Sequence, residues 1–195
     1  GVGIKDIFTK VFVANGGVIT DEESYEQSTN DFRTQLIKVK KSNPQAIYVV
    51  GYKELGQLLK QAKQLNIKAQ ILSTVMFEDP DIIKIAGSAA EGVIYSSRKY
   101  SAQNSDSVTI KFVTQYKKAY NEIPDIFAAL SYDAVKIISL AIEKGGYNAD
   151  KIKETLYSLK NYPSLRGETS FDKNGYVIQS AEIKIVKNGQ FIILQ

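Results

Sequence analysis

The sequence predicts an α/β protein with a doubly wound, mainly parallel sheet and a C-terminal hairpin. The main observation is the stretch from Gln45 to Phe77, where a short apolar run, an amphipathic helical pattern and a second apolar run follow one another. Strand, helix and strand over about thirty residues form a βαβ unit, whose two strands are parallel. The second observation is Asn188-Gly189, which separates two apolar segments as in a hairpin with a type I′ turn.

Each part of the βαβ unit has its own signature. Ala46–Val50 is a β-branched and aromatic run, which predicts a strand buried on both faces and ending at Gly51. A second apolar run begins at Ile71-Leu72. The helix between them is predicted from apolar residues at helical spacing, which are Leu55, Leu58, Leu59, Ala62 and Leu65. Ligands of open parallel sheets bind at the carboxyl ends of the strands, here Gly51-Tyr52 and Ser73–Phe77.

The N-terminal part predicts two helices and one short strand. An apolar stripe predicts an amphipathic helix over about 3–14, which Asn15-Gly16-Gly17 ends. Val18-Ile19 begins a predicted strand that runs toward Tyr25. Ser28–Asp31 offers N-cap side chains and a loose capping box for a helix that extends from Phe32 to about Lys41.

Further elements follow the βαβ unit in order. We expect a short helix that carries Ile82, Ile83 and Ile85, a strand at Gly92–Tyr95, and a polar loop from Arg98 to Ser107 that marks a lobe boundary. Three helices are then predicted, over about 106–121, from Phe127 to Gly145-Gly146, and around Ile152–Leu159. The tail predicts a strand at Gly167–Asp172 with a tight turn at Asn174-Gly175, and then the hairpin.

The composition excludes several kinds of chemistry. The 195 residues contain no Cys and no His, which excludes thiol catalysis, Cys/His zinc sites and His-based triads. The sequence contains no phosphate-binding glycine loop of the Rossmann or Walker type. The net charge of +4 comes from lysines spread over predicted helix faces, which favours solvated surfaces over a nucleic-acid interface. These absences argue against an enzyme, and we expect no cofactor, no metal site and no nucleic-acid partner.

The order and spacing of five segments resemble the type I periplasmic solute-binding proteins. The resemblance is closest to the leucine/isoleucine/valine-binding branch that serves ABC importers of branched-chain amino acids, and it covers nearly the whole chain. The segments are NDFRTQLIKVKKSNPQAIYVVGY, GQLLKQAKQLNIKAQIL, IAGSAAEGVIYSS, FAALSYDAVKIISLAIEKGG and GETSFDKNGYV.

The resemblance implies a two-lobed protein without catalysis, which traps a small ligand such as an amino acid in an interlobe cleft and delivers it to an ABC permease in the membrane. It also implies a periplasmic or extracellular location, with a lipid anchor in the precursor as one option. A ligand-sensing ectodomain of a receptor is the alternative, since receptors use the same fold.

The resemblance also implies a division into lobes. Residues 1–97 and 181–195 correspond to the C-terminal lobe without its first strand, and 98–180 to the returning part of the N-terminal lobe. The family places a lobe and a strand ahead of the segment that matches GVGIKDIF. We therefore expect a longer full-length protein, and pairing between copies of the present chain to cover its exposed edges.

The resemblance places candidate ligand contacts at two strand tips and one helix start. Tyr52 follows the first strand of the βαβ unit, and Phe127 begins the long helix, where the family commonly has an aromatic residue. The second tip contributes Ser73, Thr74, Val75, Met76 and Phe77. Family members that bind branched-chain amino acids have a Glu at the position of Val75, which pairs with the ligand ammonium.

A valine cannot pair with an ammonium group, so three interpretations of the second tip remain open. Glu78 could serve instead, if the register differs by a few residues. Val75, Met76 and Phe77 could be core residues of the lobe. The ligand could also be apolar or aromatic. For the pair Tyr132-Asp133 we expect a structural role, with a buried phenol and a hydrogen-bonded carboxylate within the helix.

Overall fold

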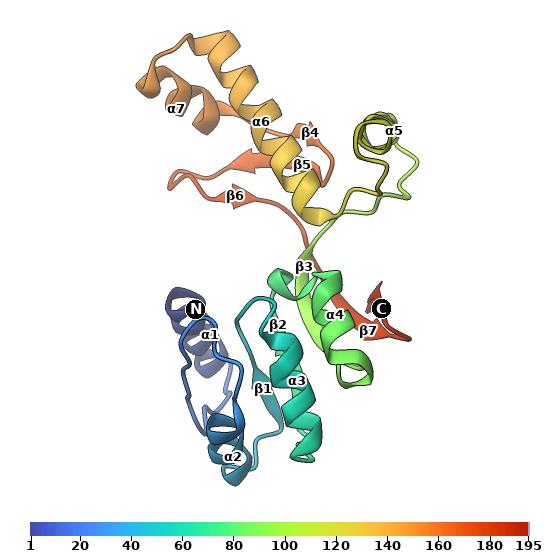
Figure 1. The fold of residues 1–195 in the computed structure, drawn as a ribbon. Coiled ribbons are helices and arrows are strands. Elements are labelled where there is room, and N and C mark those ends of the chain that lie inside the picture. The colour runs from blue at the N-terminus through green and yellow to red at the C-terminus, as the bar shows by residue number, and fades with distance from the viewer. Residues whose placement is uncertain (195) are drawn as a thin grey trace. The chain divides into compact units, whose positions relative to one another are not determined.

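The computed structural model describes residues 1–194 and divides the chain into two compact units (Figure 1). The first unit contains Gly1–Ser97 together with the C-terminal segment from Ile183, and the second contains Arg98–Glu182. The chain therefore leaves the first unit after Ser97 and returns to it at Ile183.

The first unit is built on a five-stranded sheet with the order β1-β2-β3-β7-β8. The strand bounds are β1 Ala46–Tyr48, β2 Gln70–Ser73, β3 Ile94–Arg98, β7 Ala181–Lys187 and β8 Gln190–Ile193. β1 pairs with β2 and β2 with β3 in parallel, whereas β7 and β8 form an antiparallel hairpin. The predicted βαβ unit is thus confirmed, with α3 (Leu55–Gln64) as its helix. Asn188 and Gly189 both have positive φ, as a type I′ turn requires.

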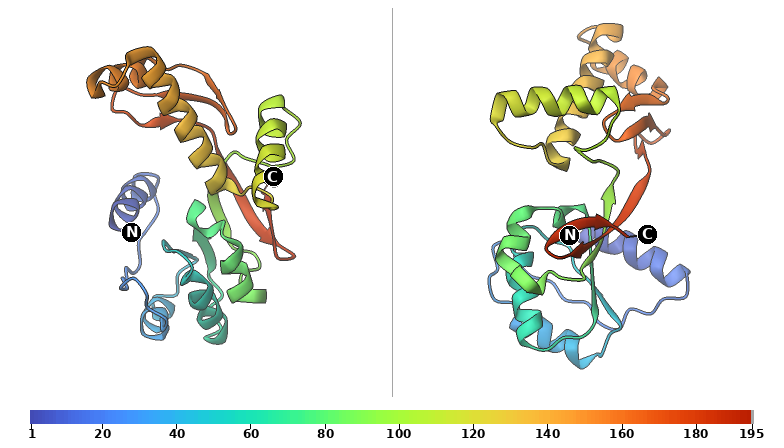
Figure 2. Two further views of the ribbon diagram at one scale, coloured as in Figure 1. Left: turned by 45° about the horizontal axis from the view of Figure 1, so that its top comes forward. Right: turned by 90° about the vertical axis from the view of Figure 1, so that its right-hand side faces the viewer.

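Helices cover both faces of this sheet. α2 (Arg33–Lys41), α3 and α4 (Pro80–Ala86) lie on one side, and α1 (Val2–Ala14) lies on the other (Figure 2). The side chains of β1 show the same division, because Ile47 packs against the core cluster of the unit while Tyr48 stacks on Phe8 of α1 at 4.1 Å. This arrangement is the predicted doubly wound sheet.

The core of the first unit forms between the sheet and α2, α3 and α4. The predicted apolar positions of α3 are buried, except Leu65, which follows the helix and is partly buried. Gly56 on the same helix faces Ile85 of α4. A Cβ added at Gly56 would lie 2.7 Å from the Ile85 side chain, so glycine allows the two helices to approach closely. The buried apolar side chains that this packing shares include Leu36, Leu58, Leu59, Ile82, Val93 and Val186.

The predicted capping box before α2 is wrong. Ser28 has a φ of 75°, and the N-cap residue of the helix is Phe32, which offers no capping side chain. Of the predicted segment, Asp31 accepts a hydrogen bond from the Arg33 N–H at 3.1 Å. Gln61 from α3 accepts a hydrogen bond from the Phe32 N–H at 2.7 Å and donates one to the Asn30 carbonyl, also at 2.7 Å. The Phe32 N–H at the start of α2 is therefore satisfied by a side chain of another helix, about thirty residues away, which the local sequence does not reveal.

The predicted strand from Val18 toward Tyr25 is also wrong. This segment has no strand pairing and lines the same cavity, of about 760 Å³, as β1. A strand requires a neighbour for its backbone groups, and β1 pairs with β2 and not with this segment.

β1 is shorter and less buried than predicted. It ends at Tyr48 instead of Val50, and Ala46 is exposed, because β1 is the last strand on its side of the sheet. The Val49 N–H donates to the Leu72 carbonyl at 2.8 Å and the Gln70 N–H to the Gln45 carbonyl at 3.0 Å. Backbone direction alternates along a strand, so the N–H and C=O groups of Ala46 and Tyr48 point to the free edge.

The second unit combines three helices with a three-stranded antiparallel sheet of order β4-β5-β6. Its elements are α5 Ser107–Tyr120, α6 Ile126–Gly145, α7 Ala149–Ser158, β4 Tyr162–Ser164, β5 Gly167–Phe171 and β6 Val177–Ile178. The three predicted helices are confirmed, and each has an N-cap side chain, from Asp106, Asp125 and Asn148. β4 was not predicted. The loop that was predicted to begin at Arg98 begins after it, because β3 includes Arg98.

Candidate functional site

Two predicted contact segments lie at the same edge of the first unit's sheet. β1 and β2 are parallel neighbours, so Gly51-Tyr52 and Ser73–Phe77 follow carboxyl ends that face the same direction. Tyr52 is 58% exposed, and its N–H donates to the Glu54 carboxylate at 3.1 Å. Phe127, the third predicted contact, lies half-buried in the first turn of α6 in the second unit.

The tip that follows β1 is held by Tyr25. The Tyr25 hydroxyl donates to the Val50 carbonyl at 2.8 Å, and a Cβ at Gly51 would overlap that hydroxyl. Burial raises the pKa of Tyr25 to about 12, so the phenol stays protonated and remains a donor. The glycine before Tyr52 is thus required by the close approach of a side chain.

The tip that follows β2 forms a short 3₁₀ turn, Val75–Phe77. The Ser73 hydroxyl donates to the Val49 carbonyl at 3.0 Å, and the Thr74 hydroxyl accepts from the Met76 N–H at 3.3 Å. Phe77 is fully buried, with its ring 5.5 Å from that of Tyr95 and 6.4 Å from that of Phe191. Of the five predicted residues, Val75 and Met76 are partly exposed and the other three are buried.

Glu78, the residue after this turn, is engaged by two strands. Its Oε1 lies 2.6 Å from Lys184 Nζ on β7, and its Oε2 accepts from the Ser97 hydroxyl on β3 at 2.5 Å. Burial, followed by the charge of Glu78, raises the pKa of the nearby Tyr95 phenol, which therefore stays neutral. Glu78 was the alternative candidate for pairing with a ligand ammonium group, and both of its carboxylate oxygens are already hydrogen-bonded within the protein.

Sequence reasoning missed Lys184. The hairpin was predicted from the apolar segments on either side of Asn188-Gly189, and the first of them contains Ile183 and Ile185. The buried face of β7 instead carries Lys184 and Val186, while Ile183 is exposed. The one available signal is that Lys184 shares the period-two face of Val186. From the sequence alone, a lysine at that position is predicted to face solvent, because its carboxylate partner Glu78 is 106 residues away.

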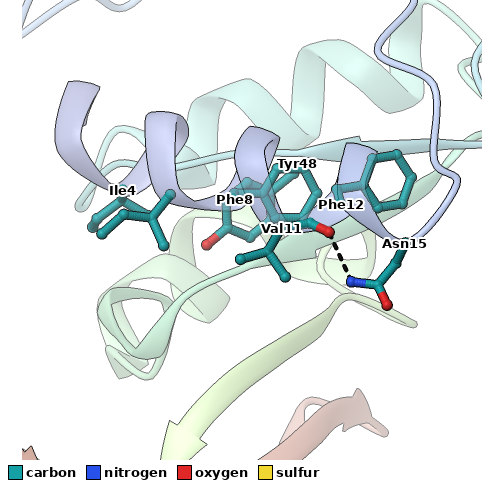
Figure 3. A pocket seen from close by; sticks show the side chains of 7 residues that line it. Ile4, Phe8, Val11, Phe12, Asn15 and Tyr48 are labelled. Atoms are coloured by element: carbon teal, nitrogen blue, oxygen red, sulfur yellow. Dashed lines mark hydrogen bonds between the residues drawn. The ribbon is translucent and has the colours of Figure 1, made fainter.

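An apolar groove lies apart from these tips, between α1 and β1. It has a volume of about 540 Å³ and is lined by one face of α1 and by Tyr48 (Figure 3). Phe8 and Phe12 stack along the helix with ring centroids 5.3 Å apart, and the Asn15 side chain donates to the Val11 carbonyl at 2.8 Å. α1 has no buried residue, so its apolar stripe, predicted correctly, faces the groove and solvent.

Between residues 1 and 194 we find no group of three acidic side chains that could hold a metal ion. In the same range, every helix is too short or too polar to cross a membrane.

The chain is similar to known proteins over almost all of its length. The family model described as periplasmic binding protein matches residues 1–190. A leucine-, isoleucine-, valine-, threonine- and alanine-binding protein of Pseudomonas aeruginosa is 30% identical over 178 residues, which are 90% of this chain and 47% of that protein. The chain thus spans about half the length of the curated relatives that it matches.

Solved structures show the same similarity. A leucine-binding protein from Thermotoga maritima is 33% identical with a TM-score of 0.89, over 100% of this chain and 56% of that one. The substrate-binding protein of a branched-chain amino-acid transporter from Streptococcus pneumoniae, solved with isoleucine, is 28% identical with a TM-score of 0.78, over 95% of this chain and 55% of that one. The chain belongs to the periplasmic binding protein family, in the type I group whose leucine/isoleucine/valine-binding members it resembles in sequence and fold.

Proposed function

We propose that this chain forms part of the solute-binding component of an ABC importer and contributes to binding an amino acid or a related small molecule. The observation that carries the proposal is the pair of accessible strand tips, Tyr52 and Val75-Met76, at one edge of a parallel sheet in a member of the periplasmic binding protein family. In this proposal the chain binds its ligand and does not catalyse a reaction. A membrane permease would be the partner, and the periplasm or the cell exterior the place of action.

The proposed mechanism is closure around the ligand. The contacts would come from Tyr52, Val75 and Met76 in the first unit and from Phe127 in the second, while Ser73, Thr74 and Phe77 would hold the tip from beneath. A ligand that contacts both units stabilises the state in which both contacts are made. That state would be the one the permease recognises.

The proposed ligand has a branched aliphatic group. Val75 and Met76 offer an apolar surface, and relatives of the chain are named for binding leucine, isoleucine and valine. Recognition of the ligand ammonium would not use Glu78, because Lys184 and Ser97 engage its carboxylate. Leucine and its 2-oxo acid, which lacks the ammonium group, are therefore a matched pair of probes.

A thermal-shift screen of the purified chain tests this function. Leucine, isoleucine or valine at about 100 times its dissociation constant is expected to raise the melting temperature by about 5–10 °C. Tyr52→Ser is expected to reduce this shift without lowering the melting temperature of the ligand-free protein, because Tyr52 is largely exposed. Tyr147→Ser, which changes a tyrosine 96% exposed in the second unit, is the control and should leave the shift intact. Absence of a shift with every branched aliphatic probe and with the 2-oxo acid would contradict the proposal.

We also propose that a second copy of the chain covers the free edge of β1 and the apolar face of α1. Antiparallel pairing of two β1 edges would satisfy the outward backbone groups of Ala46 and Tyr48 in both copies at once. Exposed apolar side chains of α1, such as Ile7 and Val11, lie beside that edge and would be buried by the same contact.

Size-exclusion chromatography with light scattering tests this pairing. The mass is expected to rise from one chain to two as the protein concentration increases. Ile7→Lys should return the protein to a monomer, because it places a charge on a surface that is 68% exposed in the single chain. Val135→Lys, at a 64% exposed position of α6, is the matched control and should leave the dimer unchanged. A monomeric mass at all concentrations would rule out this contact.

A further inference from the structure

The ion pair between Glu78 and Lys184 joins the second tip to two strands of the first unit. Glu78 follows the Val75–Phe77 turn directly, Lys184 lies on β7, and Ser97 on β3 donates to the same carboxylate. The side chains of Lys184 and Glu78 are only 7% and 14% exposed, so water screens their attraction weakly. The residue at the end of the turn is therefore fixed to both strands by charge-assisted hydrogen bonds.

These are the two strands by which the chain crosses between its units. Ser97 is the last residue of the first unit before the chain leaves it, and Ile183, next to Lys184, is the first residue after the chain returns. A backbone movement of β3 would therefore act on Glu78 through Ser97, and a movement of β7 would act on it through Lys184. The turn itself is short and well bonded, because Thr74 caps it and Phe77 anchors it in the core.

Stability alone does not account for a lysine at this position. Val186 occupies the same buried face of β7, and replacing a buried ion pair by uncharged residues of similar volume often costs little stability. A charged pair differs from apolar packing in its directionality, since it fixes the position of one particular carboxylate.

We propose that the Glu78–Lys184 pair, with Ser97, is a positioning device that couples the ligand-contacting turn to the crossing strands; this inference rests on the function proposed above. Glu78 and Lys184 are positioning residues, and neither touches the ligand. They hold Val75 and Met76 in the position that ligand binding requires. A change in the conformation of β3 or β7 would therefore change the position of the turn.

Three variants of the full chain test the coupling: Glu78→Gln, Lys184→Met and the double variant Glu78→Gln/Lys184→Met. Each single variant leaves a buried charge without its partner and is expected to lower both stability to urea and affinity for leucine. The double variant removes both charges and is expected to regain most of the stability, yet to bind leucine about tenfold more weakly than the wild type by calorimetry. Lys38→Met, which breaks the Lys38–Glu23 pair elsewhere in the first unit, is the matched control and should bind as the wild type does.

An affinity of the double variant equal to that of the wild type would overturn the proposal, because a purely structural pair would be replaced without loss. Hydrogen exchange of the ligand-free protein separates this failure from a failure of the proposed function. The N–H groups of Phe77 and Glu78 donate to the Thr74 and Val75 carbonyls, each at 2.9 Å, and should exchange faster in the double variant, while those of α3 serve as the unchanged reference. If the wild type does not bind leucine, the proposed function fails for this ligand, and the exchange rates alone decide the coupling: unchanged rates at Phe77 and Glu78 overturn it.

Discussion

Asp133→Ala is expected to lower the free energy of unfolding by about 3–5 kcal/mol, because it leaves a buried arginine without its partner. Asp133 and Arg166 form an ion pair in the second unit, with Arg166 Nε 3.0 Å from Asp133 Oδ2 and both side chains under 10% exposed. Asp133 Oδ1 also accepts from the Leu165 N–H at 3.0 Å. The carboxylate thus connects α6 to the turn between β4 and β5.

The partners of this pair continue into a network, which explains the size of the expected loss. Arg166 donates to the Gln179 side chain at 2.7 Å, Gln179 donates to the Thr169 hydroxyl, and Thr169 is hydrogen-bonded to Ser164 at 3.0 Å. Removal of Asp133 leaves the buried Arg166 with fewer partners, and an unsatisfied buried polar group costs about 1–3 kcal/mol. Asp133 therefore has the structural role expected from the sequence.

Urea unfolding followed by circular dichroism measures this loss, and amide exchange of α6 and β5 shows whether it arises in the second unit. Glu143→Ala, an exposed carboxylate on the same helix, should change the free energy of unfolding by less than about 0.5 kcal/mol. Asp133→Leu combined with Arg166→Met removes both charges and should recover part of the loss. A wild-type unfolding curve for Asp133→Ala would show that the pair does not hold the sheet to α6.

Local patterns were sufficient to predict the helices. Each predicted helix has an apolar stripe that the sequence displays within about three turns, and a helix satisfies its hydrogen bonds within its own segment. α6 is an example, because Phe127, Leu130 and Ala134 are spaced for one face and Gly145-Gly146 marks its end. The βαβ unit was predicted for the same reason, since its helix fixes the two strands on either side.

The incorrect predictions concern partners that are distant in sequence. The Val18–Tyr25 segment has strand-like residues, yet a strand is made by its neighbour, and no neighbour reaches it in the described residues. Gln61 replaces the predicted capping box because α3 packs beside the start of α2. β4 was missed because Pro163 interrupts its pattern, and its pairing with β5 depends on the turn between them.

In the candidate site, too, the features set by local sequence could be predicted, and the features set by distant residues could not. The sequence could predict where the contact segments lie, since carboxyl ends of parallel strands follow from the βαβ pattern. It could not predict which side chains of the second tip are accessible, because Phe77 is buried by Tyr95 and Phe191, both distant in sequence. It also could not predict that Glu78 is engaged by Lys184, since that contact requires β7 to join the sheet. Contact of Tyr52, Val75, Met76 and Phe127 with a ligand stays a prediction.

Phe77→Ala is expected to cost about 3–5 kcal/mol of unfolding free energy, because it removes a fully buried aromatic ring from a packed core. The ring contacts β3 through Tyr95 and β8 through Phe191, so the cavity would open beneath the turn that carries Val75 and Met76. Rigid strands on both sides limit how far this cavity can collapse, which favours the upper part of the range.

Two further variants separate the loss of volume from the loss of an aromatic ring. Phe77→Leu retains most of the volume and should cost less than about 1.5 kcal/mol. Phe12→Ala on α1 should cost much less than Phe77→Ala, because 41% of the Phe12 residue already faces water. If Phe77→Ala unfolds at the same urea concentration as the wild type, the core does not fix the turn. The positions of Val75 and Met76 would then depend on the hydrogen bonds of Ser73 and Thr74 and on the Glu78–Lys184 pair.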